Sequence, residues 1–154
     1  MRISVQEDDF DVGLEIDALC KKQTRIGAVT SFVGLVRDDF EAPIIGLELE
    51  HYAEMTQKAL TNIGKEALHR FDIFDLTIIH RFGYLALGER IVLVVTVGSH
   101  RSQSFQACEF IMDYLKTQAP FWKKEKTSRG NIWVEANKKD DTAFDKWNLG
   151  KVKE

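Results

Sequence analysis

Basic side chains gather in two stretches of this sequence, and both could hold an anion and move protons. The first is His100-Arg101, which directly follows the apolar run IVLVVTVG. The second runs from Lys116 to Arg129 and contains five basic residues and one acidic residue. Charge runs often form a solvated face, and that interpretation stays open. The aromatic pair Phe121-Trp122 lies within the second stretch, however, and a surface that only improves solubility does not need it.

The elements around the first stretch predict how His100 and Arg101 are presented. The run from Val92 to Val97 is rich in β-branched residues and predicts a strand that is buried on both faces. From Phe105 to Leu115 the apolar residues recur every three or four positions, as on one face of a helix. The start of such a helix offers unpaired N–H groups and about half a positive charge. We therefore predict an anion site at the junction Gly98-Ser99-His100-Arg101.

Lys116 lies near the end of this predicted helix and is the candidate for acid–base or nucleophilic work. Met112 lies one turn earlier on the same face, so both side chains point toward the same surroundings. Close to Arg37, Arg101 and a second lysine, the ammonium form of Lys116 is disfavoured by like charge and partial burial. More of the neutral amine is then present, and this form can take a proton or attack an electrophile.

Common catalytic fingerprints are absent from the sequence. It contains no GxSxG, P-loop, GxGxxG or HExxH motif, so no common hydrolase, nucleotide or zinc site is predicted. His51, His69 and His80 are each isolated from Asp or Cys at ligand spacing, and we interpret them as structural histidines. Cys20 and Cys108 occupy apolar helical positions without a CxxC pattern, so both are predicted to be buried thiols in a reducing compartment.

Length and charge bound the remaining possibilities. The chain has 154 residues, the size of one domain, and a formal net charge of −3. A general basic field for nucleic acid is therefore disfavoured, whereas a local basic pocket for a small anion is compatible. The N-terminus lacks an apolar signal segment and no eighteen apolar residues are continuous, so a soluble cytoplasmic protein is expected. We expect residues 1–154 to form one domain, with disorder from about residue 148.

Strand and helix patterns follow one another without repeats or long linkers. Strands are predicted over these stretches: Ile3–Gln6, Ile26–Val36, Leu47 to Tyr52, Leu76–Phe82, Val92–Val97 and a hairpin around Ser128–Asn131. Helices are predicted after a cap at Asp9 or Asp11, over Met55–Phe71, after Arg101 and from about Asp140. Leu87-Gly88-Glu89 can turn one strand back beside the next, and residues 38–45 are predicted to be a loop. This order indicates an α+β fold with a mixed, mostly antiparallel sheet.

Five segments carry a resemblance to one known family. They are GAVTSFVGLVR (27–37), LELEHYAEMTQKAL (47–60), IIHRFGYLALGE (78–89), SHRSQSFQACEFIMDYLKTQAPFWKKE (99–125) and WVEA (133–136). In this order and spacing they look like the MoaE family, the large catalytic subunits of molybdopterin synthase. The resemblance covers nearly the whole chain, and the SHR…LK…APFWKKE block is its specific part.

The resemblance implies a fold, partners and a reaction. The fold is an α/β hammerhead, and the assembly is a dimer of large subunits, each of which receives a small ubiquitin-like subunit of the MoaD type. The C-terminal glycine thiocarboxylate of that small subunit enters a pocket on the large one. Two sulfurs then pass in turn to cyclic pyranopterin monophosphate and form the dithiolene of molybdopterin. The metal enters later in the pathway, so neither a metal ligand nor a cofactor is expected here.

The resemblance also implies site residues. The expected catalytic residues are Lys116 and Lys123. The expected substrate-binding positions are Leu35, Val36, Arg37, His100, Arg101, Lys116, Lys123, Lys124 and Glu125. Phe32, Met112 and Phe121 are expected to line the groove for the partner's tail. Asn137 or Lys138 is the candidate for reaching the site of a neighbouring subunit.

Two other classes of function fit the same residues. The chain could be a non-catalytic scaffold that only docks a small β-grasp protein, with Lys116 and Lys123 as surface charges. It could also be a binding module for a phosphorylated metabolite without a protein partner. Loss of activity on lysine replacement, and co-purification of a small protein ending in Gly-Gly, would distinguish these readings from the enzyme.

Overall fold

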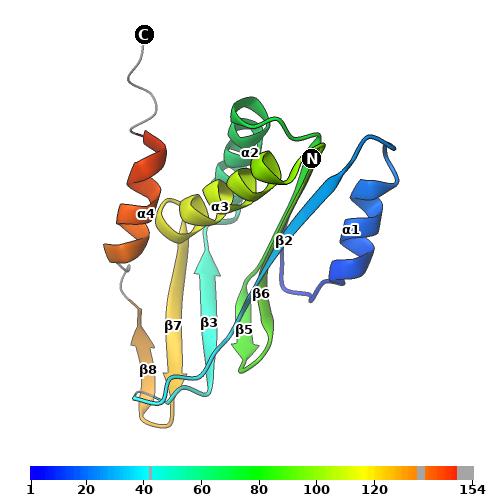
Figure 1. Cartoon of the computed structure of the whole chain (residues 1–154). Coiled ribbons are helices and arrows are strands. Elements are labelled where there is room, and N and C mark those ends of the chain that lie inside the picture. Colours follow the sequence, from blue (N-terminus) through cyan, green and yellow to red (C-terminus); the bar gives the residue numbers. More distant parts are fainter. Residues whose placement is uncertain (42, 135–137, 149–154) are drawn as a thin grey trace.

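The chain folds into two four-stranded sheets and four helices (Figure 1). The computed structural model describes residues 1–41, 43–134 and 138–148, without the side chains of Lys138 and Asn148. The strands are β1 (Arg2–Gln6), β2 (Ala28–Leu35), β3 (Gly46–His51), β4 (Asp75–Arg81), β5 (Gly83–Ala86), β6 (Arg90–Gly98), β7 (Phe121–Thr127) and β8 (Gly130–Trp133). The helices are α1 (Val12–Cys20), α2 (Ala53–Arg70), α3 (Arg101–Thr117) and α4 (Lys138–Asn148). The predicted α+β class is confirmed.

The first sheet has the order β1-β4-β6-β2, and β6 is the buried centre that its Val/Leu run predicts. The β1–β4 pair is parallel, while β4–β6 and β6–β2 are antiparallel. Every residue from Val92 to Gly98 is buried, because helices cover both faces of the sheet. This strand leads directly into α3, as the change of period after Gly98 predicts.

Helices α2 and α3 cover one face of the first sheet and α1 covers the other (Figure 1). The α2–α3 side holds the larger core, which combines Leu60 and Ile63 of α2 with Ile111 and Leu115 of α3. On the α1 side, Leu19 packs in the cluster that faces β6. The side chain of Asp11 accepts a hydrogen bond from the Leu14 N–H at 3.0 Å, so the predicted helix cap is confirmed at this residue.

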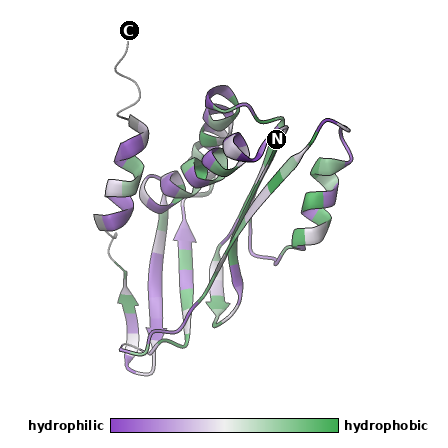
Figure 2. Cartoon of the chain, viewed as in Figure 1, coloured by the Kyte–Doolittle hydropathy of each residue, from purple (hydrophilic) through white to green (hydrophobic). Residues whose placement is uncertain are grey.

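The second sheet has the order β5-β3-β7-β8 and carries little apolar core. Its buried cluster consists of Leu49, Leu85, Val36 and Ile44. Figure 2 shows that β7 is mostly hydrophilic, unlike β6 in the first sheet. The predicted hairpin around Ser128–Asn131 is confirmed, since β7 and β8 pair as antiparallel neighbours across it.

The sequence patterns indicated one sheet, and on this point they were wrong. The segment after β4 continues as a separate strand, β5, which pairs with β3 in the second sheet. Gly83 between the two strands has a φ of 85°, a conformation that favours glycine and lets the chain leave one sheet for the other. Leu85 is fully buried in the second sheet. The sequence pattern had instead predicted that the chain turns back at residues 87–89 and places one strand directly beside β6.

Three hydroxyl side chains attach α3 to the first sheet. Ser104 is fully buried, and its Oγ donates to the Thr96 carbonyl oxygen at 3.0 Å. The Thr96 Oγ1 donates in return to the Ser104 carbonyl oxygen at 2.7 Å, and Thr30 Oγ1 lies 2.8 Å from Ser104 Oγ. Polar groups in such a core are tolerated because each has partners. The start of α3 is therefore held against β6 and β2.

Two sequence-based expectations need comment. Cys108 is buried as predicted and burial raises the pKa of its thiol to about 12, but Cys20 is only partly buried, because it lies at the last position of the short helix α1. The expected disorder from about residue 148 concerns residues 149–154, which lie outside the described part of the chain, as does Asn137.

Replacing Ser104 with Ala tests the attachment of α3. The change removes a buried hydroxyl and leaves the Thr96 carbonyl oxygen and Thr30 Oγ1 short of a partner, so the free energy of unfolding should fall by about 1–3 kcal/mol. Urea denaturation at pH 7 measures this loss. Ser102→Ala, on the exposed side of the same helix, is the matched control and should change stability by less than about 0.5 kcal/mol. Equal losses in the two variants would contradict this account of the attachment.

Candidate active site

The end of α3 and the start of β7 bring Lys116 and Lys123 together. Lys116 lies in the last turn of α3, and only residues 118–120 separate that helix from β7. Pro120 ends this connection, and the Phe121 N–H donates to the Ala119 carbonyl oxygen at 2.8 Å. The chain therefore turns sharply, and Lys123 comes back to within hydrogen-bonding reach of the Lys116 side chain. Two of the five basic residues of the second stretch, Lys116 and Lys123, therefore lie side by side.

Lys123 is the amine that this site alters. Burial lowers its pKa to about 8, and the nearby ammonium of Lys116 acts in the same direction. A hydrogen bond from Lys116 to the neutral amine adds to the effect, whereas the carboxylate of Asp140, at the start of α4, opposes it. At pH 7 about a tenth of Lys123 is therefore uncharged, far more than for a lysine with the ordinary pKa of 10.5. The sequence had suggested Lys116 for this role, but Lys116 is exposed at the helix end and Lys123 is the more buried of the two.

Aromatic rings form the other side of the lysine pair. The ring of His80, at the end of β4, stacks on Phe121 with centroids 3.7 Å apart and an interplanar angle of 19°. His51 of β3 lies against Phe82 at 4.3 Å and against Phe121 at 5.9 Å. The two sheets meet at this cluster, since His80 belongs to the first sheet and Phe121 to the second.

His80 is buried and neutral. Its Nδ1 lies 2.8 Å from the Arg81 carbonyl oxygen, which can only accept, so Nδ1 carries the proton. Burial is the main cause that lowers the pKa of His80 to about 3; the charges of Lys123 and Lys116 act in the same direction, and the hydrogen bond to the carbonyl acts against them. Among the described residues, the Nδ1 of His51 is buried without a hydrogen-bond partner. The sequence predicted a structural histidine at position 80, and the ring is buried, but the sequence did not indicate that it lies beside the lysine pair. The alternation Leu76, Ile78, His80 places its side chain on the α2–α3 face of β4.

This arrangement suits an anionic substrate that must exchange protons. An ammonium at Lys116 attracts negative charge, while Lys123 with a pKa of about 8 can both take and return a proton near neutral pH. Glu125 lies two residues beyond Lys123 and so on the same face of β7, where it is half-buried.

The other face of β7 carries cations that are already paired. Lys124 contacts Glu50 at 3.1 Å and lies over the ring of Trp133, 4.2 Å from its centroid. Lys126 contacts Glu48 at 2.8 Å. Alternation along the strand sends these side chains away from Lys123, so the structure does not bring Lys124 to the lysine pair.

His100 and Arg101 lie at the opposite end of α3 from Lys116. His100 is the N-cap residue, both side chains are exposed, and His100 makes no capping hydrogen bond through its ring. The fifteen residue steps from Arg101 to Lys116 span about 22 Å of helix at 1.5 Å per residue. Within one chain, His100 and Arg101 therefore lie far from Lys116.

The positions around Arg37 lie at the end of β2 and in the segment that follows it. Arg37 follows β2 and is exposed, with no ion pair or hydrogen bond to another residue in the described part of the chain. Leu35 is 54 % exposed, whereas Val36 is buried in the core of the second sheet. Asp38 organises the following loop, because its Oδ1 accepts from the Ile44 N–H at 3.2 Å.

The expected groove residues fall on three elements. Met112 is buried in the α2–α3 core, and Phe121 is the ring that stacks on His80. Phe32 is 41 % exposed on β2, on the same face as Thr30, which contacts α3. The three expected groove residues therefore come from α3, β7 and β2.

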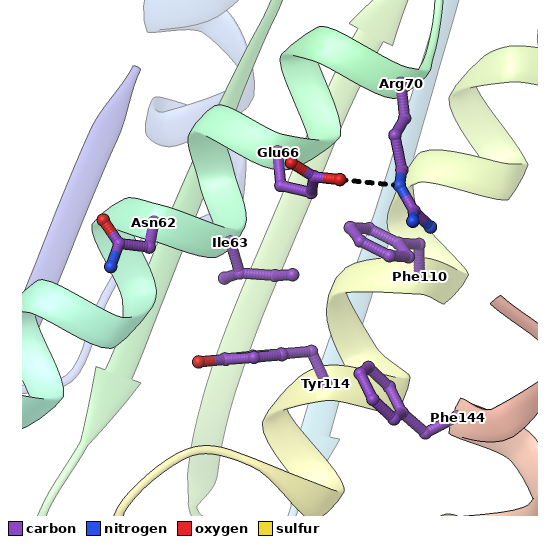
Figure 3. Close-up of a pocket in the computed structure, with 7 residues that line it drawn as sticks. All are labelled: Asn62, Ile63, Glu66, Arg70, Phe110, Tyr114 and Phe144. Atoms are coloured by element: carbon purple, nitrogen blue, oxygen red, sulfur yellow. Dashed lines mark hydrogen bonds and ion pairs between the residues drawn. The ribbon is translucent and has the colours of Figure 1, made fainter. Parts of the chain in front are cut away.

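A separate cavity between α2, α3 and α4 does not have the same chemistry (Figure 3). It has a volume of about 280 Å³ and is lined largely by apolar and aromatic side chains, among them Ile63, Phe110 and Tyr114. Its one cation, Arg70, contacts Glu66 at 2.8 Å and lies over the Phe110 ring. Because that charge is already compensated, the cavity offers little to an anion.

No group of three or more His, Cys, Asp or Glu side chains that could hold a metal ion occurs within the ranges that the structure describes. In those same ranges, no helix has the length and apolar character needed to cross a membrane.

Comparison with known proteins supplies an independent line of evidence. The family described as MoaE protein matches residues 5–118. The molybdopterin synthase catalytic subunit of Ralstonia nicotianae is 51% identical over 148 residues, which cover 96% of this chain and 84% of that protein. The MoaE protein of Burkholderia ambifaria has a solved structure with a TM-score of 0.82 and 49% identity, covering 96% of this chain and 97% of that one.

A more distant structure shows the same fold. It is the complex of subunits 1 and 2 of the molybdopterin-converting factor from Helicobacter pylori, with a TM-score of 0.72 and 23% identity over 86% of this chain and 90% of that one.

Competitive labelling with acetic anhydride tests the altered amine. Only neutral amines react, so the labelling of Lys123 against pH should have its midpoint near 8, well below the ordinary lysine value of 10.5. In Lys116→Ala the midpoint of Lys123 should rise, because a neighbouring positive charge and a hydrogen bond to the neutral form are lost. Mass spectrometry of the labelled peptides gives both curves. A midpoint of Lys123 near 10.5 in the wild type would contradict this description of the site.

Proposed function

The chain belongs to the MoaE family, and we propose that it is the catalytic subunit of a molybdopterin synthase. Its reaction transfers sulfur from the thiocarboxylated C-terminus of a small ubiquitin-like subunit to cyclic pyranopterin monophosphate. The product is the dithiolene of molybdopterin. The 51% identity with a molybdopterin synthase catalytic subunit, over 96% of the chain, supports this assignment.

The observation that carries the proposal is the half-buried Lys123 beside Lys116. Sulfur transfer with ring opening requires protons to be delivered and removed, and general acid–base groups work best when their pKa lies near the working pH. Lys123, with a pKa of about 8, meets that condition, whereas an ordinary exposed lysine does not. Lys116 then acts as the fixed cation that attracts the anionic substrate and the thiocarboxylate.

The substrate's cyclic phosphate needs further donors, and a second copy of the chain can supply them. His100 and Arg101 sit at a helix start, where backbone N–H groups favour an anion, but they lie about 22 Å from Lys116 along α3. We propose that the enzyme is a homodimer in which this end of one α3 meets the lysine pair of the other chain. Arg37, exposed and unpaired among the described residues, is a further candidate for the same substrate.

The partner is proposed to be a small subunit of the MoaD type, so that the full assembly is a heterotetramer. The fold shared with a protein that forms a complex of two subunits in Helicobacter pylori supports such a partner. A glycine tail can pass beside Met112 and Phe121 because glycine alone allows so close an approach of backbone to side chains. We place the enzyme in the cytoplasm, where the free thiols of Cys20 and Cys108 stay reduced.

The hypothesis of a non-catalytic scaffold explains Lys116 and Lys123 less well. It treats Lys116 and Lys123 as surface charges, whose amines would be solvated and fully protonated at neutral pH. A lysine that is half-buried against a second lysine costs stability, and such a cost is typical of functional sites. The identity with catalytic subunits also favours the enzyme over a binding module without a partner.

Lys116→Ala tests the enzyme against the scaffold. The variant should fold and bind the small subunit normally, yet form molybdopterin at least about a hundredfold more slowly. It loses the cation that attracts the substrate and that helps to keep Lys123 partly neutral, and proton transfer by such a group typically contributes two to four decades in rate. Single-turnover measurements with pre-thiocarboxylated partner exclude any defect in recharging the sulfur. Lys126→Ala, on the opposite face of β7, is the matched control and should keep nearly normal turnover. Normal turnover of Lys116→Ala would favour the scaffold.

Mixed dimers test the shared site. Arg101→Ala and Lys116→Ala should each be impaired alone at low substrate concentration. After co-refolding of equal amounts, half of the dimers combine one chain of each kind, and each of these has one intact site of two. Activity should then recover to about a quarter of the wild-type value. If both residues serve a site within one chain, mixing will restore nothing.

A further inference from the structure

One buried group beside the lysine pair has no part in the chemistry described so far. His80 comes from the first sheet, yet its ring lies against the first residue of β7 in the second sheet. It is 6 % exposed, and the charges of both Lys116 and Lys123 reach it. Its position is therefore at the base of the site, below the amines rather than among them.

We propose that His80 is a positioning residue for Lys123. Its neutral ring, stacked on Phe121, holds the start of β7 beside α3 and keeps water from the buried side of the Lys123 amine. This inference rests on the proposed function for its catalytic consequence, while the positioning itself can be measured without partner or substrate.

The stacking acts on Lys123 through the strand. Phe121 and Lys123 are two residues apart on β7, so their side chains point to the same face. Phe121 pairs with His51 of β3 in the ladder between β7 and β3. The ring of His80 stacks on the ring of Phe121, with the two ring centroids 3.7 Å apart. The His80 ring restrains Phe121, and this restraint limits the directions in which the Lys123 side chain can point. Without it, the first residues of β7 would be free to separate from the end of α3.

The ring must also stay uncharged for this role. The hydrogen bond from Nδ1 to the Arg81 carbonyl oxygen fixes the tautomer, so an added proton would have to go to Nε2. There it would meet the positive charges of Lys123 and Lys116 in a buried place, and the nearby His51 adds no negative charge. Burial and these charges lower the pKa of His80 to about 3, so the ring remains neutral throughout the working range. The compensating acid, Asp140, acts on Lys123 from α4.

Water exclusion connects the ring to the amine. Burial is the largest cause of the lowered pKa of Lys123, and the stacked rings of His80 and Phe121 lie at the base of the site. Removing the imidazole would leave a space that water can enter beside polar groups. The ammonium form would then be better solvated, and the pKa of Lys123 would rise toward its ordinary value of 10.5.

Two substitutions of His80 and one control distinguish the effect of the His80 ring from the effect of its nitrogen atoms. His80→Ala removes the stack, and the labelling midpoint of Lys123 should rise by at least about one pH unit. His80→Phe keeps a ring against Phe121, and the midpoint should stay within about half a unit of the wild type. His69→Ala, an exposed histidine on α2, is the matched control and should change nothing. If His80→Ala does not fold, His80→Gln replaces it, because glutamine can still donate to the Arg81 carbonyl oxygen but has no ring.

Turnover of the complete assembly gives the second readout. His80→Ala should be about tenfold slower at pH 7 and should recover most of that loss near pH 9.5, because raising the pH restores the neutral amine. A loss that persists at high pH, or an unchanged midpoint of Lys123 in the ring-free variant, would overturn the positioning role. A shifted midpoint with unchanged turnover would instead uphold the positioning of Lys123 and remove Lys123 from the proposed chemistry.

Discussion

Holding two lysine side chains together in a partly buried place is the constraint on which the site depends. Their mutual repulsion and the burial of Lys123 both oppose the folded state, so the rest of the fold has to offset that cost. The apolar core beneath α2 and α3 does so from one side. The hydroxyl contacts of Ser104 keep α3 on the first sheet, and the ladder between β3 and β7 holds the second lysine in register. The strained pair is thus supported by well-packed neighbours.

Strand β7 separates two kinds of charge by simple alternation. Its inner face presents Lys123 to Lys116, and its outer face presents Lys124 and Lys126 to glutamates of β3. The outer ion pairs are accessible to water and contribute little stability individually. They do, however, compensate the outer lysines, whereas Lys123 on the inner face has a second cation, Lys116, beside it and only the opposing effect of Asp140.

The sequence predicted much of the fold because its strongest patterns were local. The buried run of β6, the period of α3 and the cap at Asp11 all depend on neighbouring residues, and each is found. The division into two sheets depends on which distant strands pair, and the short strand β5 carries too few residues for its pattern to reveal this. For the site, the basic stretch contains the two lysines that the structure brings together. Which of them is more buried depends on the turn after α3 and on the rings of His80 and Phe121, which come from different sheets.

The length of α3 has a consequence for how an assembly of two copies behaves. In the proposed dimer, this helix is a rigid spacer with one functional group at each end, so each copy of it serves two sites at once. A change that moves the helix along its axis would disturb both sites together, one through Arg101 and the other through Lys116. The distance between the sites is then set by whole helical turns of about 5.4 Å, and the insertion or loss of a turn cannot be corrected by side-chain adjustment alone. The length of α3 in each chain therefore determines the distance between the two sites of the proposed dimer.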